Sequence, residues 1–206
     1  MTLAPGEATN GAPVAFLTAY PTGLPQPNVS NMNAIFGYAV ANSAIVPASA
    51  NGSIDVYSYN ATNLIIDVNG YFAPDDGTGR GLLFYPTSQC RIANTMSAGF
   101  TGAFGGPALM PGFDRSIHVP SSACGLPATA RAWAVNAWVA PGGTPMPFMS
   151  MWPSGTPWPN ISQLNAFQGQ TVANSSIVPC SANGGIDWRV AATTHAGLEV
   201  AGYFAR

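Results

Sequence analysis

The stretch SNMNAIFGYAVANSAIVPASANGSID, residues 30–55, occurs again as SQLNAFQGQTVANSSIVPCSANGGID at residues 162–187. The similarity extends outward without a gap, pairing 16–73 with 148–205 at a constant offset of 132 residues (148 − 16). Of the 58 paired positions, 29 are identical, which establishes an internal repeat. A repeat of fixed spacing predicts two copies of one folding unit.

The two copies differ in length. The second copy is preceded by about residues 81–136, which have no counterpart at the front of the chain. Leu3-Ala4-Pro5-Gly6 matches Val139-Ala140-Pro141-Gly142 if the first copy has four extra loop residues, so the first copy begins near the position of Ala137. The pattern predicts a truncated first unit at 1–74, a polar and Gly-rich linker at 75–80, and a complete second unit at 81–206.

Short apolar runs that end at turn residues predict strands. Asn51-Gly52 and Asn183-Gly184 lie between such runs and predict β-hairpins. No segment offers ten residues of helical periodicity free of Pro or Gly. Many short strands at roughly ten-residue spacing favour two tandem β-sandwich units (Ig-like or jelly-roll-like), the first lacking its N-terminal strands. The predicted strands are Val14–Tyr20, Val40–Val46, Ile54–Tyr59, Leu64–Val68, Gly81–Tyr85, Ser116–Val119, Arg131–Val139, Phe148–Trp152, Val172–Val178 and Leu198–Val200.

Charge is unusually sparse. Charged residues make up 7% of the 206, against roughly 25% in an average soluble domain. All six basic residues are arginine, and the net charge is −2. Nothing here favours binding to nucleic acid or an anionic membrane. No apolar run reaches the roughly 18 residues of a membrane-spanning helix, so we expect no membrane insertion. An extracellular structural protein fits this composition better than a cytoplasmic enzyme does.

The chain has three cysteines, Cys90, Cys124 and Cys180. An odd number in an exported chain predicts one disulfide and one remaining thiol. Cys90 and Cys124 both lie in the segment that only the second copy has, whereas Cys180 aligns with Ala48. We therefore favour a Cys90–Cys124 disulfide, with Cys180 buried as a small hydrophobic residue.

The second copy resembles a tandem β-repeat of bacterial secreted and cell-surface proteins. The order that carries the resemblance is CR…CGLPATA…LNA…VANSSIVP…VAGYF, over about residues 81–205, and residues 1–73 match it without the front part. The resemblance implies surface exposure and a β-architecture, and it carries no common enzymatic activity. The chain departs from the repeat's pattern at Ala93-Asn94-Thr95, where Asp-Thr-Arg is usual, and at Glu199-Val200, where Asp-Val is usual.

No catalytic or cofactor-binding residues emerge. His118 and His195 are the chain's two histidines, and no GxSxG-type context accompanies them, so we interpret both as surface or hydrogen-bonded strand residues. No CxxC or HExxH spacing predicts a metal site. Asp75-Asp76-Gly77 is interpreted as a linker turn rather than a calcium loop. Asp55 and Asp187 occupy equivalent positions, which suggests that they accept turn amides.

Five tryptophans lie in the second copy. Trp133 and Trp138 fall on opposite faces of one predicted strand, so at least one is a candidate for exposure. Exposed tryptophans stack on sugars or pack on neighbouring subunits, although core packing is more common. Trp138 and Trp158 are the candidates for a glycan or subunit contact. Sequons that matter only in a glycosylating host occur at Asn28, Asn51, Asn60, Asn160 and Asn174.

The missing front of the first copy predicts the function. A sandwich without two or three of its strands exposes unpaired backbone groups, and a bare sheet edge recruits another strand. We expect a non-enzymatic extracellular or cell-surface protein whose partners are copies of itself, joined by inter-subunit strand complementation into a filament or surface layer. The alternative is a cell-surface carbohydrate-binding or adhesion module. A hydrolase ranks third.

Overall fold

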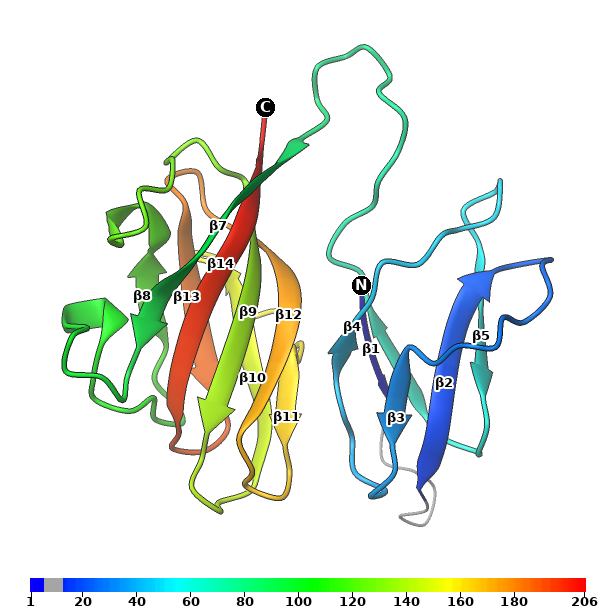
Figure 1. Cartoon of the computed structure of the whole chain (residues 1–206), viewed down its shortest axis with the longest axis horizontal. Helices are drawn as coiled ribbons and strands as arrows, with labels where there is room; N and C mark the ends of the chain where they lie inside the picture. Colours follow the sequence, from blue (N-terminus) through cyan, green and yellow to red (C-terminus); the bar gives the residue numbers. More distant parts are fainter. Residues whose placement is uncertain (6–12) are drawn as a thin grey trace. The chain divides into compact units, whose positions relative to one another are not determined.

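The computed structural model describes residues 1–5 and 13–206, and its regular secondary structure there is almost wholly β-strand (Figure 1). The strand pairings of these residues are antiparallel throughout. The described helical segments are two 3₁₀ turns, η1 (Gly102–Phe104) and η2 (Val119–Ser121). The prediction of an all-β chain is confirmed. Within the described ranges, no helix has both the length and the apolar character needed to cross a membrane.

The chain divides into two compact units, Met1–Val68 (unit 1) and Asn69–Arg206 (unit 2), each with two antiparallel sheets. The sheets of unit 1 have the orders β4-β1-β6 and β3-β2-β5, and those of unit 2 have the orders β12-β9-β14-β7 and β11-β10-β13-β8. The strands of unit 1 are β1 (Thr2–Pro5), β2 (Val14–Pro21), β3 (Met32–Ala34), β4 (Asn42–Ser43), β5 (Ile54–Ser58) and β6 (Leu64–Asp67). Those of unit 2 are β7 (Leu83–Asn94), β8 (Arg115–His118), β9 (Ala132–Ala140), β10 (Met146–Pro153), β11 (Leu164–Ala166), β12 (Val172–Pro179), β13 (Gly185–Val190) and β14 (His195–Ala205).

The sequence repeat is also a structural repeat. β2 and β10 begin and end 132 residues apart, as do β3 and β11. β5 corresponds to β13, and β6 corresponds to the first half of β14. Corresponding strands also have corresponding neighbours, since β2 lies between β3 and β5 as β10 lies between β11 and β13.

Unit 2 has one continuous hydrophobic core to which both of its sheets contribute, as expected for a β-sandwich. In β9, from Trp133 onward, buried residues alternate with half-buried ones, because successive side chains of a strand point to opposite faces. Trp133 and Leu198 of one sheet share this core with Met149 and Trp188 of the other. The core of unit 1 is much smaller. Its buried described residues are Leu3, Val14, Leu17, Ala19, Met32 and Ala34.

The two Asn-Gly turns form as predicted, but they do not close hairpins. The amide of Gly52 donates to the Ser49 carbonyl at 2.9 Å, and the amide of Gly184 donates to that of Ser181 at 2.8 Å. Both glycines have positive φ, at 82° and 84°. The flanking strands lie in different sheets, β4 and β5 in unit 1 and β12 and β13 in unit 2. Positive φ marks a tight reversal but does not determine whether the strands on either side pair with each other.

One predicted strand is much shorter in unit 1 than in unit 2. The run Val40–Val46 forms strand only at Asn42–Ser43, whereas its equivalent in unit 2 is the whole of β12. The partner strands also differ in length, since β4 pairs with the four-residue β1 and β12 pairs with the nine-residue β9.

The predicted alignment of the N-terminus is off by two residues. Thr2 lies opposite Ser43 and Asp67, as Asn136 lies opposite Ser175 and Glu199. Thr2 therefore corresponds to Asn136, and the first copy has two extra residues (136 − 2 = 134, against 132) instead of four. A shift of two keeps every side chain on the same face of the sheet, so hydrophobic alternation does not distinguish the two registers. Gly6 of that alignment lies outside the described residues.

Candidate functional site

Unit 1 has open sheet edges where unit 2 has additional strands. β14 lies between β9 and β7, whereas β6 pairs with β1 and has no described strand on its other side. In the same way β13 lies between β10 and β8, whereas β5 pairs with β2 alone among the described strands. The edges of β6 and β5 therefore correspond to the places of β7 and β8.

The open edge of β6 changes the burial of matched residues. Ile66 is 39% exposed and Val68 is 72% exposed, whereas their equivalents Leu198 and Val200 are fully buried. Val68 and Val200 are the same residue type, so the difference comes from the surroundings and not from the side chain. Exposed apolar residues gather in unit 1 generally, and they include Leu24, Val29, Ile35, Phe36, Tyr38, Ile45, Tyr59, Leu64 and Ile65.

The closing motif Gly-Tyr-Phe-Ala occurs in both copies with two different outcomes. Gly202–Ala205 is the second half of β14, where Tyr203 lies opposite Trp133 of β9 and Tyr85 of β7. Gly70–Ala73 has the same sequence and forms no strand. Phe72 is 64% exposed, although its ring contacts that of Phe204, which is 8% exposed. The same four residues form a strand only where strands are available on both sides.

A carboxylate shows the same contrast between the units. Glu199 of β14 forms an ion pair with Arg91 of β7 at 2.8 Å and accepts a hydrogen bond from Asn136 at 3.0 Å. Its equivalent in β6, Asp67, has no ion-pair partner among the described residues, and burial raises its pKa. The departure from Asp-Val at Glu199-Val200 puts a charge contact at this position in doubt from the sequence alone, whereas the structure pairs Glu199 with Arg91 of the Cys-Arg motif.

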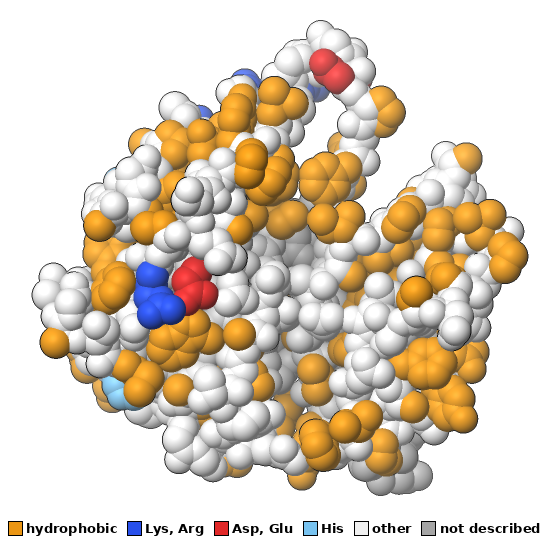
Figure 2. Space-filling model, in the orientation of Figure 1, with side chains coloured by type: hydrophobic (Ala, Val, Ile, Leu, Met, Phe, Trp, Pro, Cys, Tyr) orange, Lys and Arg blue, Asp and Glu red, His pale blue; other side chains and the backbone are white. Residues whose placement is uncertain are grey.

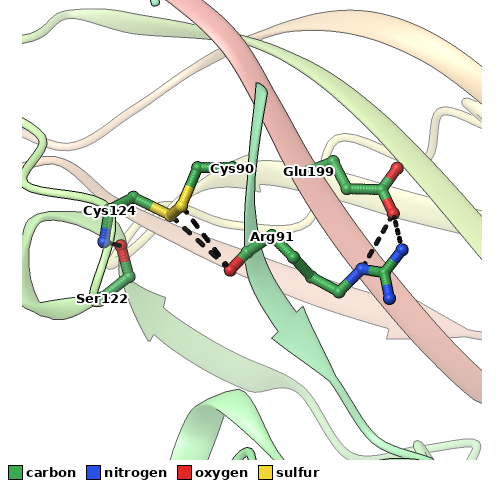
Figure 3. The surroundings of a disulfide bond; sticks show 5 residues. All are labelled: Cys90, Arg91, Ser122, Cys124 and Glu199. Carbon is green, nitrogen blue, oxygen red and sulfur yellow. Dashed lines mark hydrogen bonds and ion pairs between the residues drawn. A yellow bond between two sulfur atoms is a disulfide. The ribbon is translucent and has the colours of Figure 1, made fainter. Parts of the chain in front are cut away.

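Cys90 and Cys124 form a disulfide, the pairing that the sequence favours (Figure 3). It joins β7 to the segment that follows η2. Figure 3 shows the disulfide on one side of β7, while the side chain of Arg91 extends on the other side toward Glu199 of β14. β7 is therefore held both by a covalent bond and by an ion pair.

Cys180 is a free, half-buried thiol that packs against the core of unit 2. Its Sγ donates to the Ala130 carbonyl at 3.4 Å. Burial raises the pKa of this thiol to about 11, so it remains neutral at physiological pH. A neutral, half-buried thiol is a poor nucleophile, which fits a packing role.

The histidines lie in separate hydrogen-bonded pairs. Nδ1 of His118 is 2.6 Å from the hydroxyl of Ser121, and both residues are exposed. Nδ1 of His195 is 3.1 Å from the hydroxyl of Thr95. Neither pair includes a carboxylate among the described residues, so a Ser-His-Asp arrangement is not formed there. Within the described part of the chain, no three or more His, Cys, Asp or Glu side chains cluster in a way suited to a metal ion.

The conspicuous aspartates are arranged around turns. Asp75 and Asp76 accept the backbone amides of Gly77 and Thr78, both at 2.9 Å, which is the Asx-turn geometry. Asp187 accepts from the hydroxyl of Ser154 at 2.6 Å and from the Gly155 amide at 3.4 Å.

Asp55, the equivalent of Asp187, accepts from the hydroxyl of Thr22 at 2.8 Å. Asp55 therefore contacts the Pro-Thr-Gly turn of the first copy, and Asp187 contacts the Pro-Ser-Gly turn of the second. The contacts fit the structural role that the repeated positions suggest.

The tryptophans occupy different environments. Trp133 is fully buried and donates from Nε1 to the Gly184 carbonyl at 3.1 Å. Trp158 stacks on Phe148, with ring centroids 5.4 Å apart, and lies 4.6 Å from the guanidinium of Arg189. A sugar at Trp158 would therefore have to compete with these two contacts.

Trp138 is half-buried on the opposite face of β9 from Trp133, and its indole covers Gly197 of β14. A Cβ atom added to Gly197 would lie 2.3 Å from the indole ring. Glycine at this position therefore allows the ring to approach the neighbouring strand closely.

The five sequons differ in accessibility. Asn28, Asn51 and Asn160 are exposed. The side chain of Asn60 accepts the Ala15 amide at 3.1 Å, and that of Asn174 donates to the Gln163 carbonyl at 2.7 Å. A glycan on Nδ2 of Asn174 would compete with that hydrogen bond, whereas the bond at Asn60 uses Oδ1 and not the nitrogen that carries a glycan.

Searches of protein-family models and of curated proteins returned no match to this chain. The internal repeat therefore supplies the comparison, since unit 2 shows contacts that the equivalent described residues of unit 1 lack.

Proposed function

We propose that the protein is a non-enzymatic structural subunit that assembles with copies of itself by β-strand complementation at unit 1. The exposure of Val68 carries the proposal, because the same residue at the same position of the repeat is fully buried in unit 2, where β7 and β8 extend the two sheets. The repeat resemblance, the low charge and the disulfide support an extracellular or cell-surface location.

An open edge of this kind favours strand addition for two reasons. The outer amides and carbonyls of β6 have no strand partner among the described residues, so an added strand gains main-chain hydrogen bonds. The apolar side chains beside them gain burial, at about 25 cal/mol for each Å² removed from water. Charge offers little opposition to this association, because charged residues make up only 7% of the chain. Few of them appear on the face that Figure 2 shows.

The incoming strand should have the character of β7. In unit 2 that strand places Arg91 opposite Glu199, and Asp67 is the equivalent acid in unit 1. A basic residue opposite Asp67 would form the missing ion pair, and an alternating apolar residue would cover Val68. If the donor and acceptor surfaces lie at different places on the subunit, the contact is head-to-tail and extends into a filament unless it closes into a ring.

The substitution Val68→Asp tests this assembly. In the isolated subunit Val68 is 72% exposed, so the variant should fold normally. In the assembled state the carboxylate would be buried without a partner, which costs several kcal/mol and should prevent filament formation. Negative-stain electron microscopy and sedimentation velocity of the full chain over a range of concentrations measure the result.

The matched control is Ile45→Asp. Ile45 is 73% exposed, and its equivalent Ile177 stays partly exposed in the complete unit 2. We expect the control to assemble like the wild type. A wild-type chain that remains monomeric at high concentration, or a Val68→Asp variant that assembles normally, would contradict the proposal.

A further inference from the structure

The outer face of the β12-β9-β14-β7 sheet has an aromatic platform beside a row of polar groups. Trp138 of β9 lies opposite Gly197 of β14, and Asn94 of β7 lies opposite the same glycine. Asn136 and Arg91 both lie opposite Glu199, which is two residues further along β9 and β14 and three residues away along β7, where a β-bulge shifts the register. Residues two apart on a strand share a face and lie about 7 Å from each other.

The indole of Trp138 has a fixed orientation. It covers Gly197, where any larger residue would meet the ring at 2.3 Å. The ring remains partly exposed, and its Nε1 has no hydrogen-bond partner among the described residues. A flat aromatic ring held on a rigid sheet suits stacking against the apolar face of a pyranose.

The polar row offers both donors and acceptors while being electrically neutral. Arg91 uses Nε and Nη2 to bind one oxygen of Glu199, and Asn136 donates to the other. Nη1 of Arg91 and Oδ1 of Asn136 keep free hydrogen-bonding capacity within the described part of the chain. Because Arg91 and Glu199 neutralise each other, the row suits vicinal hydroxyl groups better than a carboxylate or a sulfate.

The face has a third polar neighbour on the other side of the platform. His195 precedes Gly197 by two residues on β14, so it lies on the same face, and its ring is oriented by the hydroxyl of Thr95. The equivalent face of unit 1 lacks the platform, since Ala4 and Ile65 occupy the positions of Trp138 and Gly197. The site is therefore specific to unit 2.

We propose that this outer face binds a neutral hexopyranose glycan, with one ring stacked on Trp138 and its hydroxyls bound by Arg91, Glu199 and Asn136. This inference is independent of the proposed assembly, because it concerns a different surface and a complete sheet. It assigns the carbohydrate contact to Trp138 rather than to Trp158, whose ring already stacks on Phe148 and lies beside Arg189.

Isothermal titration calorimetry of the full chain with cellohexaose and with chitohexaose tests the site. We expect saturable binding of at least one of them, weakened at least about tenfold by Trp138→Ala and retained within about threefold by Trp138→Phe. Asn136→Ala should weaken binding while leaving the thermal transition near that of the wild type. The control Trp158→Ala removes an aromatic residue that stacks on Phe148 of β10 in the other sheet, and it should bind as the wild type does.

Three outcomes would overturn the proposal. The first is that neither hexasaccharide binds at millimolar concentration. The second is that Trp158→Ala weakens binding as much as Trp138→Ala does. The third is a preference for oligogalacturonate over both neutral oligosaccharides. Loss of binding in Trp138→Phe together with a lowered thermal transition would show a packing role for the ring and would also count against the site.

Discussion

The Leu198→Ala substitution is expected to destabilise unit 2 by about 2–5 kcal/mol, because it leaves a cavity among fully buried neighbours. The matched substitution Ile66→Ala in unit 1 should cost far less in dilute protein, since that side chain is already 39% exposed. The five tryptophans all lie in unit 2, so urea unfolding followed by tryptophan fluorescence reports on unit 2 alone. Far-ultraviolet circular dichroism adds the transition of unit 1.

The informative quantity is the difference between the destabilisation caused by Leu198→Ala and that caused by Ile66→Ala. If unit 1 is incomplete, the cost of Ile66→Ala should rise with protein concentration as assembly buries the side chain. Equal costs for the two substitutions at low concentration would mean that unit 1 has a closed core of its own.

Removing the disulfide should lower the free energy of unfolding of unit 2 by an amount similar to that of Leu198→Ala. The bond between Cys90 and Cys124 spans a sequence separation of 34 residues, and closing a loop of that length stabilises a fold by about 3–4 kcal/mol in the chain-entropy description. The double variant Cys90→Ser/Cys124→Ser is expected to lose that amount, measured by the same fluorescence transition. β7 should loosen first, because it is an edge strand of its sheet.

The matched control for the disulfide is Cys180→Ala. The repeat already carries Ala48 at the equivalent position, and the thiol of Cys180 is only half-buried, so a small effect is expected. The account of how β7 is held would be contradicted if Cys180→Ala lowered the free energy of unfolding as much as the double variant does. It would also be contradicted if the double variant did not lower it.

The repeat and the strand content could be predicted from the sequence, because they depend on local signals. Alternating burial, Pro-terminated runs and Asn-Gly turns all lie within a few residues of each other. The pairing of strands depends on distant partners and was harder to predict. The segments around Asn51-Gly52 and Asn183-Gly184 read as hairpins, whereas the turns connect different sheets.

The candidate sites were only partly predictable for the same reason. Val68 follows β6, which has no described strand on its outer side. Its equivalent Val200 lies in β14, which pairs with β7. The position of Trp138 over Gly197 depends on a cross-strand register, and the Arg91–Glu199 pair joins residues 108 apart. A glycine inside a predicted closing strand was the visible signal for close approach of a large side chain.

The central claim is that β6 of unit 1 lacks a strand which another copy supplies. Hydrogen–deuterium exchange of the full chain, followed by mass spectrometry of peptides covering 64–68 and 196–200, tests it most directly. We expect the β14 peptide to be protected at every protein concentration, and the β6 peptide to exchange fast in dilute protein and slowly in concentrated, assembled protein. Equal protection of the two peptides in dilute, monomeric protein would contradict the claim.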